Sequence, residues 1–175
     1  MSPAWNATNM NDAAAPSRLP HRAAKAHRWE EVEERPYKED SRALFKDISR
    51  QILFSDPDLA AELRYFEVKP GGFSTLERHE HMHAVMILRG GGHCLVGDKV
   101  HEIKEHDLVT VPPWTWHQFR ATTREPLGFL CMVNALRDKP QLPTEADIAE
   151  LERQPAVARF FAGDAAGPGK LRRGR

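Results

Sequence analysis

The stretch LERHEHMHAVMILRGGG, residues 76–92, carries four side chains of metal-ligand type at alternate positions: Glu77, His79, His81 and His83. In a straight β-strand, alternate side chains point to the same face. A row of imidazoles makes a poor apolar core, whereas neutral imidazole is the commonest metal ligand in proteins. A further histidine, His117, ends the segment PPWTWH. We therefore look for the function at this row and at His117.

The overall composition argues against several classes of protein. Lys plus Arg and Asp plus Glu each number 25 in 175 residues, so the formal net charge is zero. A nucleic-acid surface would show a strong basic excess, and no apolar run approaches the roughly 18 residues that span a bilayer. Cys94 and Cys131 do not make a disulfide framework, and both are expected to be buried, inert thiols. We expect a cytoplasmic protein that binds neither nucleic acid nor membrane.

Composition and the spacing of apolar residues divide the chain into five segments. Residues rich in Ala, Pro, Asn and Ser open it, apolar residues at helical spacing follow, and short β-type runs fill the middle. We expect a disordered segment 1–27, an extension 28–62 with a short amphipathic helix around 41–54, a barrel 63–136, a helical extension 137–162 and a disordered basic tail 163–175.

The middle segment has the pattern of an antiparallel β-protein. Several short strands separated by turn residues follow one another within about 75 residues, which is typical of a small sandwich or barrel. Gly97–Asp98 lies between two such runs and predicts a two-residue hairpin turn. After the barrel, Thr144 and Asp147 resemble a helix capping box, and Pro155 can open a second helix.

Two stretches resemble the sequence motifs of the cupin superfamily. PGGFSTLERHEHMHAVMILRGGG (70–92) looks like the first motif and HDLVTVPPWTWHQF (106–119) looks like the second. The resemblance covers roughly residues 63–134 and implies an all-β fold, the antiparallel cupin barrel or double-stranded jelly-roll, here with short N- and C-terminal helices. It departs from the usual pattern where His106 and Trp114 replace glycines.

The resemblance also implies a ligand set. The first cupin motif supplies His-x-His and then a carboxylate seven residues before a glycine, and the second motif supplies one histidine five residues after a proline. Counted back from Gly90, His83 takes the carboxylate position, so the earlier pair falls on Glu77 and His79. The implied ligands are Glu77, His79, His83 and His117.

Chain geometry favours this set. Four same-face positions on one straight strand span about 20 Å, whereas ligand bonds to one ion measure about 2 Å. A turn at residues 80–82 would return His83 to the side of Glu77 and His79. Two alternatives stay open: a tighter bend that uses His79, His81, His83 and His117, and a solvated strand face that binds no metal.

Three imidazoles and one carboxylate suit a single divalent transition metal, with Fe as the first choice and Zn, Mn, Ni or Co as alternatives. We expect the site to be lined by Arg64, which could hold a substrate carboxylate, and by an aromatic mouth. His81, left over from the ligand set, is the candidate catalytic acid–base residue. The expected members of the aromatic mouth are Trp114, Trp116 and Phe119.

These residues support three functions for a site that binds a small-molecule substrate. The first is a metal-dependent dioxygenase, an oxidoreductase in which substrate and oxygen bind at open positions on the metal. The second is a non-redox isomerase, decarboxylase or lyase, in which the metal polarises a carbonyl and His81 moves protons. The third is a cupin that binds a small molecule without catalysis. In each case we expect a homodimer, as in many small cupins.

Overall fold

The structure, a computed structural model, describes residues 23–38, 44–56 and 59–163. The chain divides into two units, residues 1–31 and 32–175. In the first unit, β1 (Ala23–Lys25) and β2 (Arg28–Trp29) form a small antiparallel hairpin, which begins inside the segment 1–27 that was predicted to be disordered. Most of that predicted segment, 1–22, lies outside the described residues, as does the tail 164–175.

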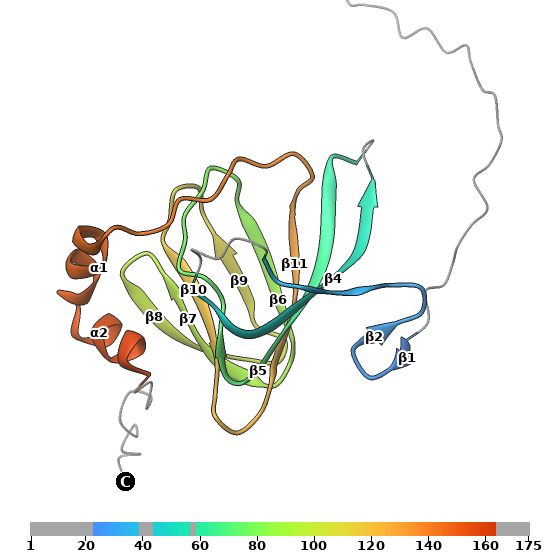
Figure 1. The fold of residues 1–175 in the computed structure, drawn as a ribbon, viewed down its shortest axis with the longest axis horizontal. Helices are drawn as coiled ribbons and strands as arrows, with labels where there is room; N and C mark the ends of the chain where they lie inside the picture. The colour runs from blue at the N-terminus through green and yellow to red at the C-terminus, as the bar shows by residue number, and fades with distance from the viewer. Residues whose placement is uncertain (1–22, 39–43, 57–58, 164–175) are drawn as a thin grey trace, which may run out of the picture. The chain divides into compact units, whose positions relative to one another are not determined.

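One antiparallel sheet forms the second unit (Figure 1). Its main path runs β8-β7-β10-β5-β11-β6-β9, with β4 also on β5 and β3 on β4. The strands are β3 (Glu34–Pro36), β4 (Lys46–Asp56), β5 (Ala61–Phe73), β6 (His83–Arg89), β7 (Gly91–Val96), β8 (Lys99–Lys104), β9 (Leu108–Val111), β10 (His117–Ala121) and β11 (Leu127–Asn134). The sheet curls into a half-barrel, so the predicted all-β jelly-roll class is confirmed.

Strand β5 holds the curled sheet together, because it pairs with β4, β10 and β11. It bends near its end, where Gly71 has a φ of 72°, a conformation that costs glycine little. A Cβ atom on Gly72 would lie 2.5 Å from the carbonyl oxygen of Lys46. Glycine at this position therefore lets β4 approach β5 closely enough to pair at Lys46↔Phe73.

The helix predicted around residues 41–54 is wrong. Residues 46–56 form strand β4, which pairs with β5 along most of its length, and 39–43 lie outside the described residues. Leu44, Ile48 and Ile52 recur every four residues, which fits one helix face. Four is also a multiple of two, so the same spacing fits one strand face. The β-branched isoleucines and the edge offered by β5 favour the strand.

Apolar side chains on the concave face of the sheet form the main core. Phe129 stacks on Phe66 and on Phe119, with ring centroids 5.3 Å and 4.8 Å apart. These contacts join β5, β10 and β11. Cys94 and Cys131 belong to the same core and are free thiols, as expected.

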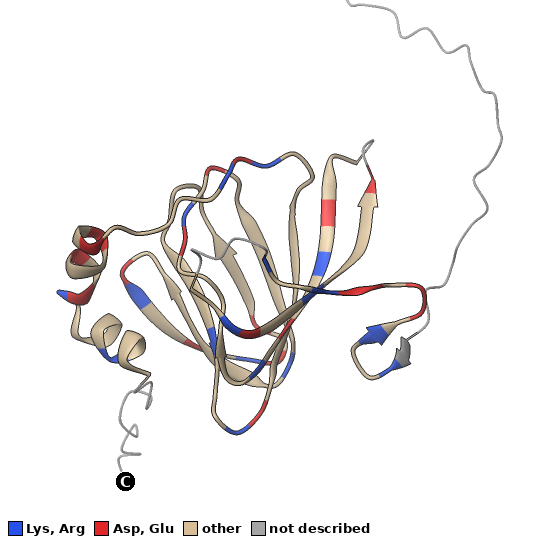
Figure 2. Cartoon of the chain, viewed as in Figure 1, with Lys and Arg blue, Asp and Glu red and all other residues tan. Residues whose placement is uncertain are grey.

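Two helices follow the sheet, as predicted: α1 (Glu145–Glu152) and α2 (Pro155–Ala162). Thr144 and Asp147 form the reciprocal capping box of α1, and Pro155 is the first residue of α2. The acidic residues of α1 stand out in Figure 2, where residues of both charges are also spread over the strands. No helix among the described residues is long and apolar enough to cross a membrane.

A second apolar cluster attaches these helices to the sheet. Trp116 and Leu95 belong to it, and each is a sequence neighbour of a residue on the concave side, so strand alternation turns it outward. Leu151 of α1 and Phe160 of α2 pack in the same cluster, and Phe160 is fully buried. The helices thus pack against β7, β8 and Trp116, the residue before His117.

We expect Phe160→Ala to lower the free energy of unfolding by about 3–5 kcal/mol, because the substitution removes a large buried side chain and leaves a cavity. Urea unfolding followed by circular dichroism measures this change. The control is Leu136→Ala, whose side chain is 91% exposed, and we expect a change within about 0.5 kcal/mol. Equal effects of the two substitutions would show that α2 does not stabilise the sheet.

Candidate metal centre

A chain reversal brings the two histidine-bearing segments together. Glu77 and His117 form an isolated antiparallel bridge, with each backbone amide donating to the other residue's carbonyl oxygen at 3.2 Å and 3.0 Å. The chain then bends at residues 80–81 and starts β6 at His83. The turn predicted at 80–82 is therefore present, and His83 returns beside His79.

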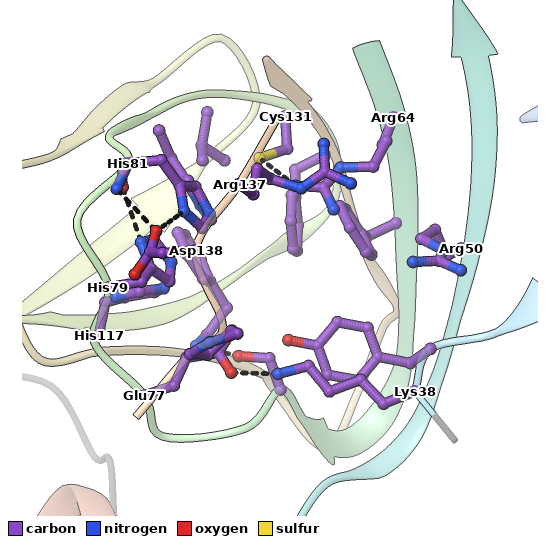
Figure 3. A pocket seen from close by; sticks show the side chains of 18 residues that line it. Lys38, Arg50, Arg64, Glu77, His79, His81, His117, Cys131, Arg137 and Asp138 are labelled. Carbon is purple, nitrogen blue, oxygen red and sulfur yellow. Dashed lines mark hydrogen bonds and ion pairs between the residues drawn. The ribbon is translucent and has the colours of Figure 1, made fainter. Parts of the chain in front are cut away.

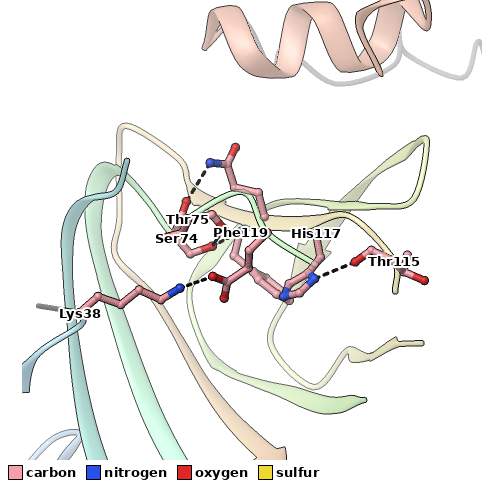
Figure 4. A network of polar contacts seen from close by, with 8 residues as sticks. Lys38, Ser74, Thr75, Thr115, His117 and Phe119 are labelled. Atoms are coloured by element: carbon pink, nitrogen blue, oxygen red, sulfur yellow. Dashed lines mark hydrogen bonds and ion pairs between the residues drawn. The ribbon is translucent and has the colours of Figure 1, made fainter. Parts of the chain in front are cut away.

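A network of polar contacts fixes the start of β10 against residues 74–77 (Figure 4). The backbone amide of Ser74 donates to the carbonyl of Phe119, and the hydroxyl of Ser74 accepts from the Phe119 amide, both at 2.9 Å. The side-chain amide of Gln118 donates to the Ser74 carbonyl at 2.8 Å. These buried bonds hold His117 in register with the turn.

His79, His83 and His117 converge at this point, and all three are buried. Their candidate ligand nitrogens lie within 4.8 Å of one another. Two ligands on opposite sides of one ion, with bonds of about 2.1 Å, are about 4.2 Å apart. Small side-chain adjustments would therefore let the three nitrogens share an ion.

Backbone carbonyls orient two of these imidazoles. Nδ1 of His79 lies 2.7 Å from the carbonyl oxygen of His81, and Nδ1 of His117 lies 2.9 Å from that of Thr115 (Figure 4). A carbonyl can only accept, so Nδ1 carries the proton and Nε2 keeps its lone pair. Nε2 of His79 and Nε2 of His83 are buried without a hydrogen-bond partner in the described structure. Such orphaned nitrogens fit a metal ion.

Electrostatics keeps the three imidazoles uncharged. Burial lowers the pKa of His79 to about 3, with further lowering by His117 and His81. Burial is also the largest cause that lowers the pKa values of His83 and His117. A metal ligand must be the neutral imidazole, so the triad is in ligand form near neutral pH. The sequence prediction of a ligand role for these three histidines agrees with their geometry.

Glu77 lies differently from the predicted fourth ligand. Its carboxylate is not in the group of ligand atoms that converge with the three histidines, and Oε2 pairs with Nζ of Lys38 (Figure 3). Lys38 precedes the barrel by a long stretch of sequence, so strand spacing offers no signal for this contact. The role of Glu77 as a metal ligand stays a prediction.

His81 stacks on His79, with ring centroids 3.6 Å apart, and faces the same cavity. Its Nδ1 lies 2.6 Å from Oδ1 of Asp138, whose carboxylate also accepts from the backbone amides of Glu80 and His81. His79, His81 and Asp138 form a second group with ligand atoms within 4.8 Å, sharing His79 with the triad. Asp138 thus holds the imidazole that the sequence proposed as a catalytic residue.

A cavity of about 200 Å³ opens beside the triad. Figure 3 shows the histidines and Asp138 on one side and arginine side chains on the other. Of the predicted pocket residues, Arg64 and Phe119 line the cavity. The lining residues that the sequence analysis missed include Tyr37, Lys38, Arg50, Arg137 and Asp138.

Trp114 and Trp116 are not among the residues that line this cavity, so the structure does not bring the predicted tryptophans to it. Trp116 precedes the inward-facing His117, and strand alternation turns it outward into the cluster beneath the helices. The guanidinium of Arg78 lies 4.4 Å from its ring centroid. Trp114 is 49% exposed, at a turn where its φ is 56°.

Comparison with known proteins gives close relatives. One is 60% identical over 137 residues, which is 78% of this chain and 88% of the relative; it is the 1-methylthio-D-xylulose 5-phosphate methylsulfurylase of Rhodospirillum rubrum. A crystal structure of a cupin-2 domain protein from Rhodospirillum rubrum is 57% identical, with a TM-score of 0.76, over 85% of this chain and 99% of that one. A cupin 2 conserved barrel domain protein from Rhodopseudomonas palustris is 56% identical, with a TM-score of 0.75, over 79% and 96%.

The first of these relatives corrects the functional prediction. A methylsulfurylase is not a dioxygenase, so the prediction of a dioxygenase-like oxidoreductase is wrong. The prediction rested on the ligand types and on the resemblance to cupins, and a set of histidines serves redox and Lewis-acid chemistry equally well. The non-redox alternative agrees better with this relative.

The family model of the cupin domain matches residues 64–133, from near the start of β5 to near the end of β11. This segment contains the histidine triad, both motifs and every strand of the main sheet path. Together with the identity to the relatives, it shows that the chain belongs to the cupin superfamily.

Proposed function

We propose that this protein is a metal-dependent cupin enzyme that acts, without redox chemistry at the metal, on a methylthio-substituted pentulose phosphate. The observation that carries the proposal is the 60% identity to the methylsulfurylase over 78% of the chain. The cavity supports it, because it combines a candidate metal triad, an oriented imidazole and several cationic side chains. In a 1-methylthio-2-ketose, the carbon that bears sulfur lies next to the carbonyl, which is the arrangement a Lewis acid can activate.

The metal would be held by His79, His83 and His117. A bound divalent ion supplies Lewis-acid polarisation of a substrate carbonyl. The three imidazoles add no charge of their own, and the carbonyls of His81 and Thr115 fix the orientation of two of them. Glu77 would join as a fourth ligand only after it leaves Lys38. This set of ligands does not favour Fe over Zn, Mn, Ni or Co.

We propose that His81 holds and moves the proton at the substrate carbon next to the carbonyl. Its Nδ1 faces Asp138, which fixes the ring and leaves Nε2 for the cavity. The stack on His79 keeps this imidazole beside the triad. The side chain therefore meets the geometric requirement for an acid–base residue, namely reach of the reacting atoms from a fixed ring.

We expect His83→Ala and His117→Ala to lose bound metal, and the affinity to fall by more than the 10- to 100-fold that is typical when only a partner of a ligand is removed. Metal analysis of each variant after gel filtration measures the amount of metal bound per chain. His81→Ala should keep its metal, since Nδ1 of His81 already faces Asp138. The matched control is His101→Ala, an exposed position on β8. Full metal content in both triad variants would contradict the proposed centre, and equal loss in Glu77→Gln would add Glu77 to it.

We expect His81→Ala to lower kcat on 1-methylthio-D-xylulose 5-phosphate by about 10²–10⁴-fold, the usual contribution of a positioned proton-transfer group. Asp138→Asn should lower kcat less, because the ring remains but loses its orienting carboxylate. The assay follows loss of substrate, with and without an added thiol as acceptor of the methylthio group. Metal content is measured in parallel. Undiminished kcat in metal-loaded His81→Ala would remove His81 from the mechanism, and no turnover by the wild type would overturn the substrate.

The homodimer expected from the sequence stays a prediction. Sedimentation velocity of the purified full chain over a range of concentrations tests it directly. A sedimentation coefficient of a single chain at all concentrations would contradict it.

A further inference from the structure

We infer that Arg50, Arg64 and Arg137 form a subsite for a phosphate group on the side of the cavity opposite the histidines. Its identification with the phosphate of a sugar substrate rests on the proposed function, whereas the presence of an anion site does not. All three side chains line the cavity, and Figure 3 shows them away from His79, His81 and His117.

Strand register explains why two of these arginines face inward. Arg64 on β5 lies opposite Cys131 on β11, and Cys131 lies opposite Val85 on β6. Cross-strand partners share a face, and Val85 lies two residues from His83 on the same face of β6. Arg64 therefore points to the side of the sheet that carries the triad.

The register of β4 against β5 places Arg50 on the same face of the sheet. Arg50 pairs with Phe66, which lies two residues from Arg64 on β5. The two guanidinium groups are thus diagonal neighbours on adjacent strands, on the concave side of the barrel. Arg137 follows β11 in the loop that also supplies Asp138.

The acidic side chains around these arginines do not balance them. Oε1 of Glu62 lies 3.5 Å from Nε of Arg64 and 3.4 Å from a terminal nitrogen of Arg137, so one buried carboxylate serves two guanidinium groups. The pKa of Arg50 is lowered by burial and next by the charge of Arg64. A cation that its neighbours repel favours a site for an added anion.

Unsatisfied hydrogen-bond donors also indicate an anion site. In the described structure, Nε of Arg50 and Nε of Arg64 are buried without a hydrogen-bond partner. A terminal nitrogen of Arg64 donates to Sγ of Cys131, a weak acceptor, at 3.9 Å. Arg64 itself is 8% exposed, and burial of a charged donor without a strong acceptor is costly. A phosphate oxygen would supply such acceptors.

A phosphate group matches this arrangement better than a carboxylate does. It offers three acceptor oxygens and up to two negative charges, and planar guanidinium groups bind such oxygens in pairs. A substrate held by its phosphate among the arginines would extend across the cavity toward the triad. Carbonyl and phosphate at opposite ends of a five-carbon chain suit this separation, so the subsite would also set the direction in which the substrate binds.

The first test measures binding without catalysis. Inorganic phosphate should raise the unfolding temperature of the full-length wild type, because a ligand that binds only the folded state stabilises it. Protection should be lost in Arg50→Met and Arg137→Met, and retained in the control Arg124→Met, an exposed arginine in the loop before β11. His117→Ala should also retain protection, since its triad is broken and its arginines are intact.

Two outcomes of this test would overturn the inference. Equal protection of wild type and both arginine variants would remove these residues from anion binding. Protection that disappears in His117→Ala and persists in the arginine variants would assign phosphate to the metal centre. If a methionine variant fails to fold, Arg50→Lys keeps a cation at the position, and we expect it to retain only part of the protection.

The second test measures substrate recognition. Arg50→Met and Arg137→Met should raise KM for 1-methylthio-D-xylulose 5-phosphate by about 10- to 100-fold, the loss expected for a hydrogen bond to a charged group. The kinetic parameters for phosphate-free 1-methylthio-D-xylulose should not change. Unchanged KM for the phosphorylated sugar would overturn the subsite. If no substrate turns over but phosphate protection follows the arginines, the proposed function fails and the anion subsite stands.

Discussion

The antiparallel bridge between Glu77 and His117 is the contact on which the centre depends. It joins the segment that follows β5 to the first residue of β10, so two stretches forty residues apart share one register. The bend at residues 80–81 then needs only to return the chain to β6. Because a shift by one residue would turn every side chain to the other face, this bridge decides whether His117 points to His79 and His83 or away from them.

The sequence predicted those parts of the fold that local patterns determine. The hairpin at Gly97–Asp98, the capping box of Thr144 and the start of α2 at Pro155 all depend on residues within a few positions of one another. The strand at 46–56 was predicted as a helix, because apolar residues at intervals of four fit both periods. Residues 46–56 form a strand because they pair with β5, a partner distant from much of β4 in the sequence.

The residues of the site also divide into those that sequence patterns predicted and those that they did not. The turn that unites His79 and His83 followed from the limited reach of one ion, and His117 followed from motif spacing. The contact of Lys38 with Glu77 joins residues 39 positions apart, and that of Asp138 with His81 joins residues 57 positions apart. No spacing rule links such residues. The outward position of Trp116 was predictable, since it alternates with His117, and the prediction did not apply that rule.

The distribution of charge across the cavity connects the metal centre with the arginines. The triad contributes no charge. Of the two carboxylates beside it, Glu77 is paired with Lys38, and Asp138 is hydrogen-bonded to His81. A divalent ion on three neutral ligands keeps most of its positive charge, which strengthens its action on a carbonyl oxygen. On the opposite side, Arg64 and Arg137 share Glu62, and the charge of Arg64 helps to lower the pKa of Arg50. Both ends of the cavity therefore favour negative charge, one where it develops during reaction and the other where the substrate already carries it. A substrate with a carbonyl at one end and a phosphate at the other satisfies both ends in a single orientation.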